Sequence, residues 1–199
     1  MTTYDAGNDI CLGFWKECYS DARWMDFPPN AKVLELGCAE ADWQTPMLAL
    51  RPDLQITGID WRQIERPGTI IRGNILEHDF GAAAFDAIVA VSCIEWVGIG
   101  HYHDPGADQR DPVDEDGDRK AMARCARWLK PGGWMYLDVP HRPKEREGVG
   151  KLKLRAYSEQ ALQERVIQPY FRELRRQTFQ PNHPDGPYVA LLLKHKEAE

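Results

Sequence analysis

Short apolar runs bounded by turn residues recur along the chain and predict β-strands. Helical patterns lie between several of them. One predicted helix, Trp43 to Leu50, ends at Arg51-Pro52 because a proline ring is incompatible with a continuing helix. Another, Gly117 to Leu129, ends at Lys130-Pro131-Gly132-Gly133. Alternation of strands and helices implies a parallel sheet in an α/β fold. The predicted strands are Lys32 to Leu36, Gln55 to Asp60, Thr69 to Gly73, Phe85 to Val91 and Trp134 to Val139.

The two ends of the chain show different patterns. Ser158 is placed to cap a short helix, and Phe171 to Phe179 and Tyr188 to Lys196 predict two strands. The segment between these strands is rich in proline, glycine and asparagine, which favours an antiparallel hairpin with a long turn. Residues 1–30 mix aromatic and charged residues, which predicts an amphipathic helical cap before a domain of residues 31–199.

Length and composition narrow the classes of protein. With 199 residues, 43% of them hydrophobic, the chain is expected to bury one core in a single domain. We find no apolar run near ~18 residues and no charged-then-apolar leader, so we expect a cytoplasmic protein with no membrane partner. Five cysteines without paired metal-type spacing indicate reduced thiols. The net charge of -6 disfavours nucleic acid as a partner.

Charge is unevenly distributed along the chain. From His101 to Asp118 there are seven acids against Arg110 alone, whereas Arg142 to Arg155 holds six basic residues against two acids. The basic stretch is either a solvated surface loop or a flap over an anionic substrate. The acidic stretch permits a divalent metal, although we favour no metal site, and we expect Asp116 and Asp118 to cap the helix that follows.

The strongest chemical signal is the run Val33 to Ala41. An apolar strand that ends in an acid, a glycine and small residues is typical of a nucleotide-binding turn, because small residues let the backbone approach a ligand. The second strand ends at Asp60, and an acid at this position usually binds ribose hydroxyls. The glycine spacing of nicotinamide-binding folds is absent, which argues against that cofactor.

These features occur in an order that resembles the class I S-adenosylmethionine-dependent methyltransferases. The resemblance covers about Ala31 to Lys196 and includes Leu129-Lys130-Pro131-Gly132-Gly133 before the fifth strand and the terminal hairpin. It implies a Rossmann-like α/β fold with helices on both faces of a seven-stranded, mainly parallel sheet. One antiparallel strand would come from the hairpin. It also implies S-adenosylmethionine as methyl donor and S-adenosylhomocysteine as product.

The resemblance assigns cofactor-binding roles by position. Asp60 would accept both ribose hydroxyls, and Trp61 would stack on the adenine. Ala39 and Ala41 stand where the family often has glycine, and Asn74 where it usually has an acid. A Rossmann-like sheet that has lost its ligand is therefore the alternative. The full predicted set is Glu35, Gly37, Cys38, Ala39, Asp60, Trp61, Asn74, Ile75, Ser92 and Cys93.

Methyl transfer to a hydroxyl needs alignment and a base. The segment after the fourth strand offers His101, His103 and Glu95 as candidate catalytic bases, although the histidines are equally read as exposed loop residues and Glu95 as a turn cap. The segment lacks the acid or asparagine followed by two prolines and an aromatic residue that nucleobase amino-methylating enzymes usually have, and no cysteine follows a proline. Nucleic acid is therefore not favoured as the acceptor.

A weaker resemblance, from Ser92 to Gly133, is to methyltransferase-like domains associated with glycan assembly. It implies O-methylation of a small polar acceptor such as a sugar. The alternatives are a non-catalytic scaffold that binds the cofactor and an N-methyltransferase of a small amine or a protein. The oligomeric state stays open.

Two further groups of residues are candidates for the pocket. His141 and Arg142 follow the fifth strand, and Arg142 is suited to bind a carboxylate or phosphate of an acceptor. In the cap, Tyr4, Trp15 or Trp24 would form the wall of a lid that excludes water, or would pack in the core.

Overall fold

The computed structural model describes residues 27–38, 44–62, 68–100, 113–142, 146–149, 152–179 and 187–196. The predicted cap, apart from residues 27–30, lies outside this part of the chain, as do Tyr4, Trp15 and Trp24. Within the described part, no helix is both long and apolar enough to cross a membrane.

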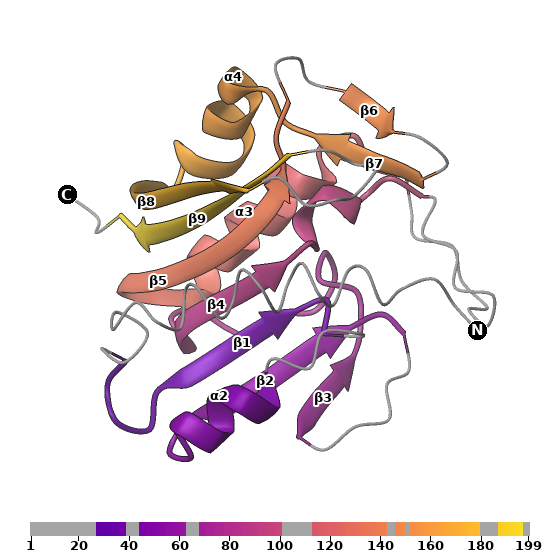
Figure 1. Ribbon diagram of the computed structural model, residues 1–199. Helices are drawn as coiled ribbons and strands as arrows, with labels where there is room; N and C mark the ends of the chain where they lie inside the picture. The colour runs from indigo at the N-terminus through magenta and orange to yellow at the C-terminus, as the bar shows by residue number, and fades with distance from the viewer. Residues whose placement is uncertain are drawn as a thin grey trace.

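A seven-stranded sheet forms the centre of the molecule, in the order β3-β2-β1-β4-β5-β9-β8 (Figure 1). The first five strands run parallel, whereas β9 is antiparallel to both of its neighbours, β5 and β8. This arrangement confirms the predicted fold class and the C-terminal hairpin. The strands are β1 (Lys32–Leu36), β2 (Gln55–Asp60), β3 (Thr69–Arg72), β4 (Phe85–Val91), β5 (Leu129–Pro140), β8 (Phe171–Phe179) and β9 (Tyr188–His195).

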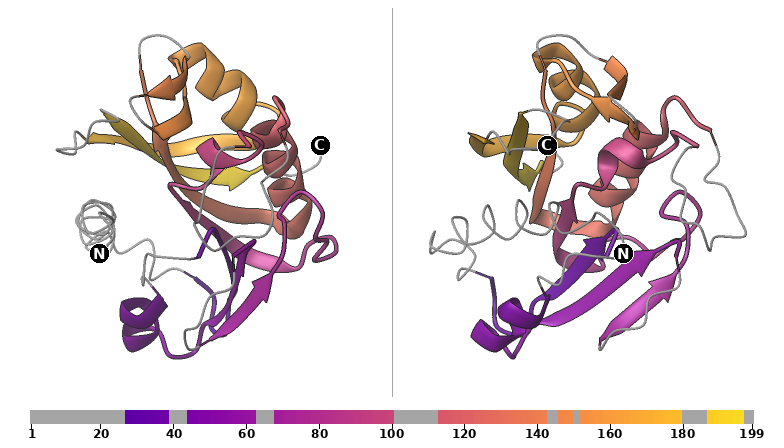
Figure 2. Two further views of the ribbon diagram at one scale, coloured as in Figure 1. Left: turned by 90° about the vertical axis from the view of Figure 1, so that its right-hand side faces the viewer. Right: turned by 45° about the vertical axis from the view of Figure 1, so that its right-hand side comes forward.

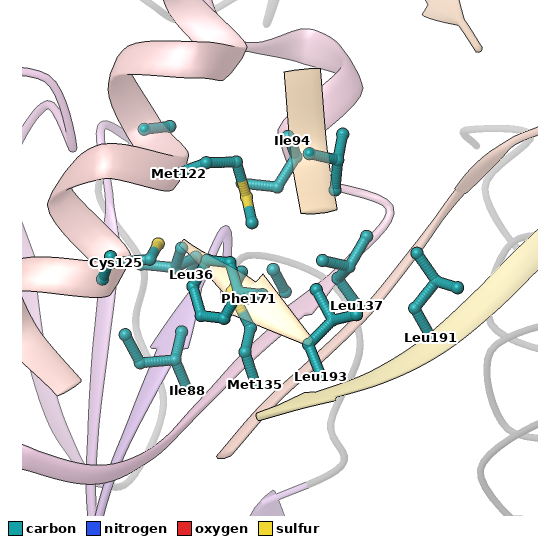
Figure 3. Close-up of a cluster of buried hydrophobic side chains, with 14 of the residues drawn as sticks. Leu36, Ile88, Ile94, Met122, Cys125, Met135, Leu137, Phe171, Leu191 and Leu193 are labelled. Carbon is teal, nitrogen blue, oxygen red and sulfur yellow. The ribbon is translucent and has the colours of Figure 1, made fainter. Parts of the chain in front are cut away.

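Helices cover both faces of the sheet, and consecutive strand residues serve opposite faces. On one face, Met47 of α2 (Gln44–Leu50) packs with Val33 and Val89. On the other, α3 (Gly117–Trp128), the short α4 (Glu159–Ala161) and its π-helical continuation η3 (Leu162–Ile167) form the larger core (Figure 3). Met122 and Cys125 of α3 are completely buried there. Each fully buried large apolar side chain contributes about 1.5–3 kcal/mol.

Helix ends follow the sequence closely. The Ser158 hydroxyl accepts a 3.1 Å hydrogen bond from Ala161 N and so caps α4 as predicted. Helix α3 ends at Trp128, and β5 begins at Leu129 rather than at the predicted Trp134. Leu129 already pairs with Phe85, and a register shift absorbs the proline–glycine segment before Trp134 pairs with Ala87.

A two-stranded ribbon, β6 (Arg146–Val149) and β7 (Leu152–Ala156), follows β5 and was not predicted. Figures 1 and 2 show it at the same end of the molecule as α4. Leu154 and Ala156 are buried against Trp96 of the short 3-10 helix η2 (Ile94–Trp96), so the expectation of a solvated loop is wrong for β7. The many charges in this stretch hide the alternation of its apolar residues.

Asp118 organises the start of α3 by long-range bonds. Its buried carboxylate accepts hydrogen bonds from Arg165 Nη2 (2.7 Å), Arg165 Nε (2.8 Å) and the Tyr157 hydroxyl (3.0 Å). Arg155 Nη1 lies 3.7 Å from its Oδ1. Asp116 is the N-cap residue, but its exposed side chain makes no capping hydrogen bond, so the predicted capping by Asp116 is wrong. Asp118 instead connects the start of α3 to the segments that carry Arg155, Tyr157 and Arg165. We call these four residues the arginine joint.

Candidate functional site

A cleft opens at the carboxyl ends of β1, β2 and β4, beside the turn that follows β3. Ligands of open α/β sheets bind at this edge, outside the strand ends. The cleft contains about 620 Å³ of empty space, part of which is open to solvent. Its lining residues are Gly37, Ile59, Asp60, Trp61, Arg62, Gly73, Asn74, Ile75, Ser92, Cys93, Trp96 and Val97.

Gly37 brings the first turn close to the end of β4. Its φ of 69° lies in the left-handed region that favours glycine. A Cβ at this position would lie 2.8 Å from Cys93 Sγ, too close for any side chain. The backbone is fixed by a 2.9 Å hydrogen bond from Gly37 N to Ile59 O. Cys93 therefore occupies the space that a side chain at position 37 would need, and Gly37 lines the cleft with backbone atoms alone.

Asp60 lies at the tip of β2 with its side chain almost completely buried. Its Oδ1 accepts hydrogen bonds from Arg62 N (2.9 Å) and Arg62 Nε (3.0 Å), and its Oδ2 accepts one from Arg62 Nη2 (3.2 Å). The carboxylate is thus oriented by a residue two positions later in the chain. A ligand that takes Oδ2 as acceptor shares it with Arg62 or displaces the guanidinium.

The other predicted cofactor residues divide into three groups. Trp61, Asn74 and Ile75 line one side of the cleft, and the Asn74 side chain accepts a 2.8 Å hydrogen bond from Leu76 N that fixes this turn. Glu35 and Cys38 are buried and do not line the cleft; the Glu35 carboxylate accepts a hydrogen bond from Gln44 Nε2. Ala39 lies outside the described residues.

Ser92 joins the end of β4 to two buried acids. It has a left-handed φ of 44°, which is unusual for serine. Its Oγ donates a 2.7 Å hydrogen bond to Glu95 Oε1, and its N donates a 2.9 Å hydrogen bond to Asp138 Oδ1. Glu95 is completely buried in η2 and does not itself line the cleft. Ser92 therefore connects the cleft to Glu95.

Burial changes the acid–base properties of two groups beside Ser92. It raises the pKa of Asp138 to about 7, against the opposing hydrogen bonds from Ser92 N and Tyr136. Desolvation, with the negative charges of Glu95 and Asp60 nearby, raises the pKa of the Cys93 thiol well above its ordinary value. Cys93 therefore stays protonated at neutral pH and contributes shape rather than a thiolate nucleophile.

The structure describes one of the three candidate histidines, His141. His101 and His103 lie outside the described residues and remain predictions. His141 Nε2 lies 3.5 Å from Glu159 Oε2, beyond the end of β5. No group of three or more His, Cys, Asp or Glu side chains in the described ranges could hold a metal ion, and most of the acidic stretch lies outside those ranges.

A sequence comparison identifies the family. The profile of a family described as a methyltransferase domain matches residues 20–177. The chain belongs to the methyltransferase domain family. The predicted membership of the S-adenosylmethionine-dependent methyltransferases is thereby confirmed. No curated protein matches the sequence of this methyltransferase domain.

Solved structures share the fold of this methyltransferase domain at low identity. A Burkholderia thailandensis 1,6-didemethyltoxoflavin-N1-methyltransferase, solved with S-adenosylhomocysteine, is 16% identical with a TM-score of 0.65; the match covers 99% of this chain and 92% of that one. The N-methyltransferase NodS of Bradyrhizobium japonicum is 16% identical with a TM-score of 0.61, over 92% and 88% of the chains. The [4+2]-cyclase SpnF has the same identity and TM-score over 92% and 81%. Such a fold therefore serves more than one chemistry.

Sequence reasoning missed several residues of this methyltransferase site. Arg62 was passed over although it stands two residues after Asp60, where a side chain can fold back onto the carboxylate. Asp138 was read as part of an apolar strand, and its contact with Ser92 spans 46 positions. Trp96 and Val97 line the cleft because η2 turns at the end of β4, and no local pattern marked that turn.

Proposed function

We propose that this chain transfers the methyl group of S-adenosylmethionine to an oxygen of a small polar acceptor such as a sugar. The observation that carries the proposal is the cleft itself, where seven of the ten predicted cofactor residues meet at one edge of the sheet: Gly37, Asp60, Trp61, Asn74, Ile75, Ser92 and Cys93. Family membership supports methyl transfer as the reaction class.

The described residues fit a nucleoside cofactor. Asp60 offers a buried, oriented carboxylate to the ribose hydroxyls, and Trp61 offers a flat ring to the adenine. Gly37 lines the cleft without a side chain, so the methionine end of the cofactor can lie against its backbone. When bound, S-adenosylmethionine supplies a methyl group on a sulfonium, which an aligned nucleophile can take by in-line displacement.

Ser92 and Glu95 offer a route for the acceptor's proton. As an acceptor hydroxyl loses its proton to Ser92 Oγ, the serine hydroxyl proton passes to Glu95 Oε1 across the 2.7 Å hydrogen bond. Glu95 thus acts as a base through Ser92, in place of a direct contact with the acceptor. His101 and His103 remain the alternative bases in this proposal.

A nitrogen acceptor is the second candidate, because the two methyltransferases compared above are named as N-methyltransferases. The two acceptors differ in their demand for a base. An amine that is already deprotonated attacks without one, so substitution of Glu95 by Gln reduces turnover of a hydroxyl much more than turnover of an amine. Mass spectrometry of products from pooled sugars and pooled amines identifies the acceptor class.

The first experiment is calorimetric titration with S-adenosylhomocysteine. We expect micromolar binding to the native chain and a loss of about 100-fold or more in Asp60→Ala, because two charge-assisted hydrogen bonds are each worth about 1.5–3 kcal/mol.

Asp53→Ala is the matched control for this titration. Asp53 holds Arg51 with the same fork of two hydrogen bonds, both 2.8 Å, but is not among the residues that line the cleft. Its variant should bind as the native chain does. Absence of binding to the native chain would reject the proposed cofactor, and equal losses in both variants would reject the role of Asp60.

A further inference from the structure

We propose that Arg142 binds an oxyanion, a carboxylate or a phosphate, carried by the methyl acceptor. The inference deepens the proposed function, on which it rests, by giving the acceptor a negative charge. A sugar acid or a sugar phosphate fits this description, whereas a neutral sugar does not.

The first observation is that part of the Arg142 guanidinium is buried without a hydrogen-bond partner. Neither Nε nor Nη2 contacts solvent or an acceptor atom in the described part of the chain. Buried donors are nearly always paired, because an unsatisfied donor destabilises the fold, and a charged one does so more strongly. These two nitrogens form one side of the fork that matches two oxygens of a carboxylate or phosphate.

The backbone that carries Arg142 is firmly held. Arg142 N donates a 2.8 Å hydrogen bond to Tyr157 O, and Tyr157 N donates a 2.9 Å hydrogen bond to Pro140 O. His141 N donates another, also 2.9 Å, to Pro187 O. The side chain therefore starts from a fixed point between β5, β7 and β9, as a binding residue requires.

Arg142 also lies at the correct edge of the sheet. It follows β5, which is parallel to β4, so both strands end at the edge where the cleft opens. Asp138, four residues before it, accepts the hydrogen bond from Ser92 N. An acceptor anchored at Arg142 would be held at the edge of the sheet where Ser92 offers its hydroxyl.

Three other arginines that the structure describes in this region are paired within the protein. Arg155 and Arg165 contact Asp118, and Arg176 binds both Glu159 and Glu173. The surrounding stretch from Arg142 to Arg155 carries six basic residues against two acids, which attracts anions. Arg142 thus differs from these paired arginines, because two of its buried donors have no partner. A bound anion explains this difference.

The test uses inorganic phosphate and acetate as probes on the full chain saturated with S-adenosylhomocysteine, with the thermal midpoint as readout. We expect the native chain to gain stability with millimolar phosphate or acetate. Arg142→Gln should bind the anion about 10- to 100-fold more weakly, and Arg142→Lys should fall between because it keeps the charge but loses the fork.

Arg127→Gln is the control, because it removes the same charge from an exposed position at the end of α3, where Arg127 pairs with Asp79. It should respond to the anions as the native chain does. Without anions, Arg142→Gln should be as stable as the native chain or more so, since a purely structural arginine would cost stability when removed.

Each outcome bears on the inference. A stronger response to phosphate than to acetate assigns a phosphate ester, and the reverse assigns a carboxylic acid. An equal gain in Arg142→Gln and in the native chain would show an adventitious ion only and overturn the inference. If S-adenosylhomocysteine fails to bind, the proposed function fails, while the anion titration without it still reports on Arg142.

Discussion

The side-chain contacts of the cleft are mostly local, whereas those of the arginine joint are long-range. In the cleft, Asp60 is held by Arg62 and Ser92 by Glu95, over separations of two and three positions. In the joint, Arg155 donates to Val97 O across 58 positions, and Arg165 donates to Asp118 across 47. Local bonds orient side chains on short turns, whereas the long-range bonds fix whole segments relative to one another.

The long-range bonds of the arginine joint hold two turns together. Arg155 also donates to Glu115 O, so one guanidinium ties the turn after η2 to the turn before α3. These two turns flank residues 101–112, and Asp114 N donates a 2.8 Å hydrogen bond to Gly98 O at their base. The joint therefore anchors the ends of the segment that carries His101 and His103. The cleft keeps contacts that a ligand can exchange.

Asp118→Asn tests the long-range contacts of the arginine joint and should have the largest effect on stability. The substitution leaves two arginines beside a neutral group in a buried site, which should lower the free energy of unfolding by about 3–5 kcal/mol. Urea denaturation measures this loss. Calorimetry on the folded fraction should still find S-adenosylhomocysteine binding, because the cleft keeps its own local bonds.

Asp116→Asn is the control for this change. Asp116 lies two residues away with its side chain 57% exposed, 3.7 Å from Arg165 and 3.9 Å from Arg119. Exposed pairs of this kind contribute about 0–1 kcal/mol. Comparable losses in both variants would mean that the joint has no special role in stability.

Asp138 is a buried acid beside the cleft, and in the described part of the chain its carboxylate accepts hydrogen bonds from Ser92 N and the Tyr136 hydroxyl. Its folded pKa, about 7, exceeds the ordinary value of 3.8. As pH rises from about 4 to about 7, the unfolded chain releases this proton before the folded chain does. The free energy of unfolding should therefore fall by about 2–4 kcal/mol across that window.

The Asp138→Asn variant tests the assignment of this pH dependence. Asparagine keeps an oxygen for Ser92 N but cannot ionise, so its stability should lack the fall between about pH 4 and pH 7. Urea denaturation of both proteins at several pH values gives the two profiles. Parallel profiles would show that other groups cause the dependence.

Gly98→Ala tests the contact between the two turns. Gly98 has a φ of 81°, and a Cβ there would lie 2.2 Å from Asp114 O. Gly81→Ala is the matched control, since Gly81 has a φ of 83° and nothing within 4 Å of the added Cβ. Gly81→Ala should cost about 1 kcal/mol from backbone strain alone, and Gly98→Ala about 1–3 kcal/mol more in thermal or urea denaturation. Equal losses would show that the turns separate without cost.

Features that depend on local contacts were predictable from the sequence, whereas features that depend on long-range contacts were not. Strands β1, β2 and β4, the position of Asp60 at the tip of β2 and the cap at Ser158 each depend on a few consecutive residues, and the sequence predicts all of them. The ribbon was missed because its stability depends on burial of Leu154 and Ala156 against η2, nearly sixty positions earlier. Local reasoning assigns Asp118 as a helix cap because its partners Arg155 and Arg165 lie beyond the rest of α3 and all of β5 in the sequence.

The contact between Gly37 and Cys93 restricts how this chain can evolve. A Cβ at position 37 would lie 2.8 Å from Cys93 Sγ and 3.0 Å from Cys93 Cβ, so even with alanine at position 93 the end of β4 would have to move by a few tenths of an ångström. Replacement of Gly37 is therefore expected to follow a change at position 93, or a shift of the end of β4, rather than to precede it. The order of substitutions at these two positions is thus restricted, with the cysteine position changing first.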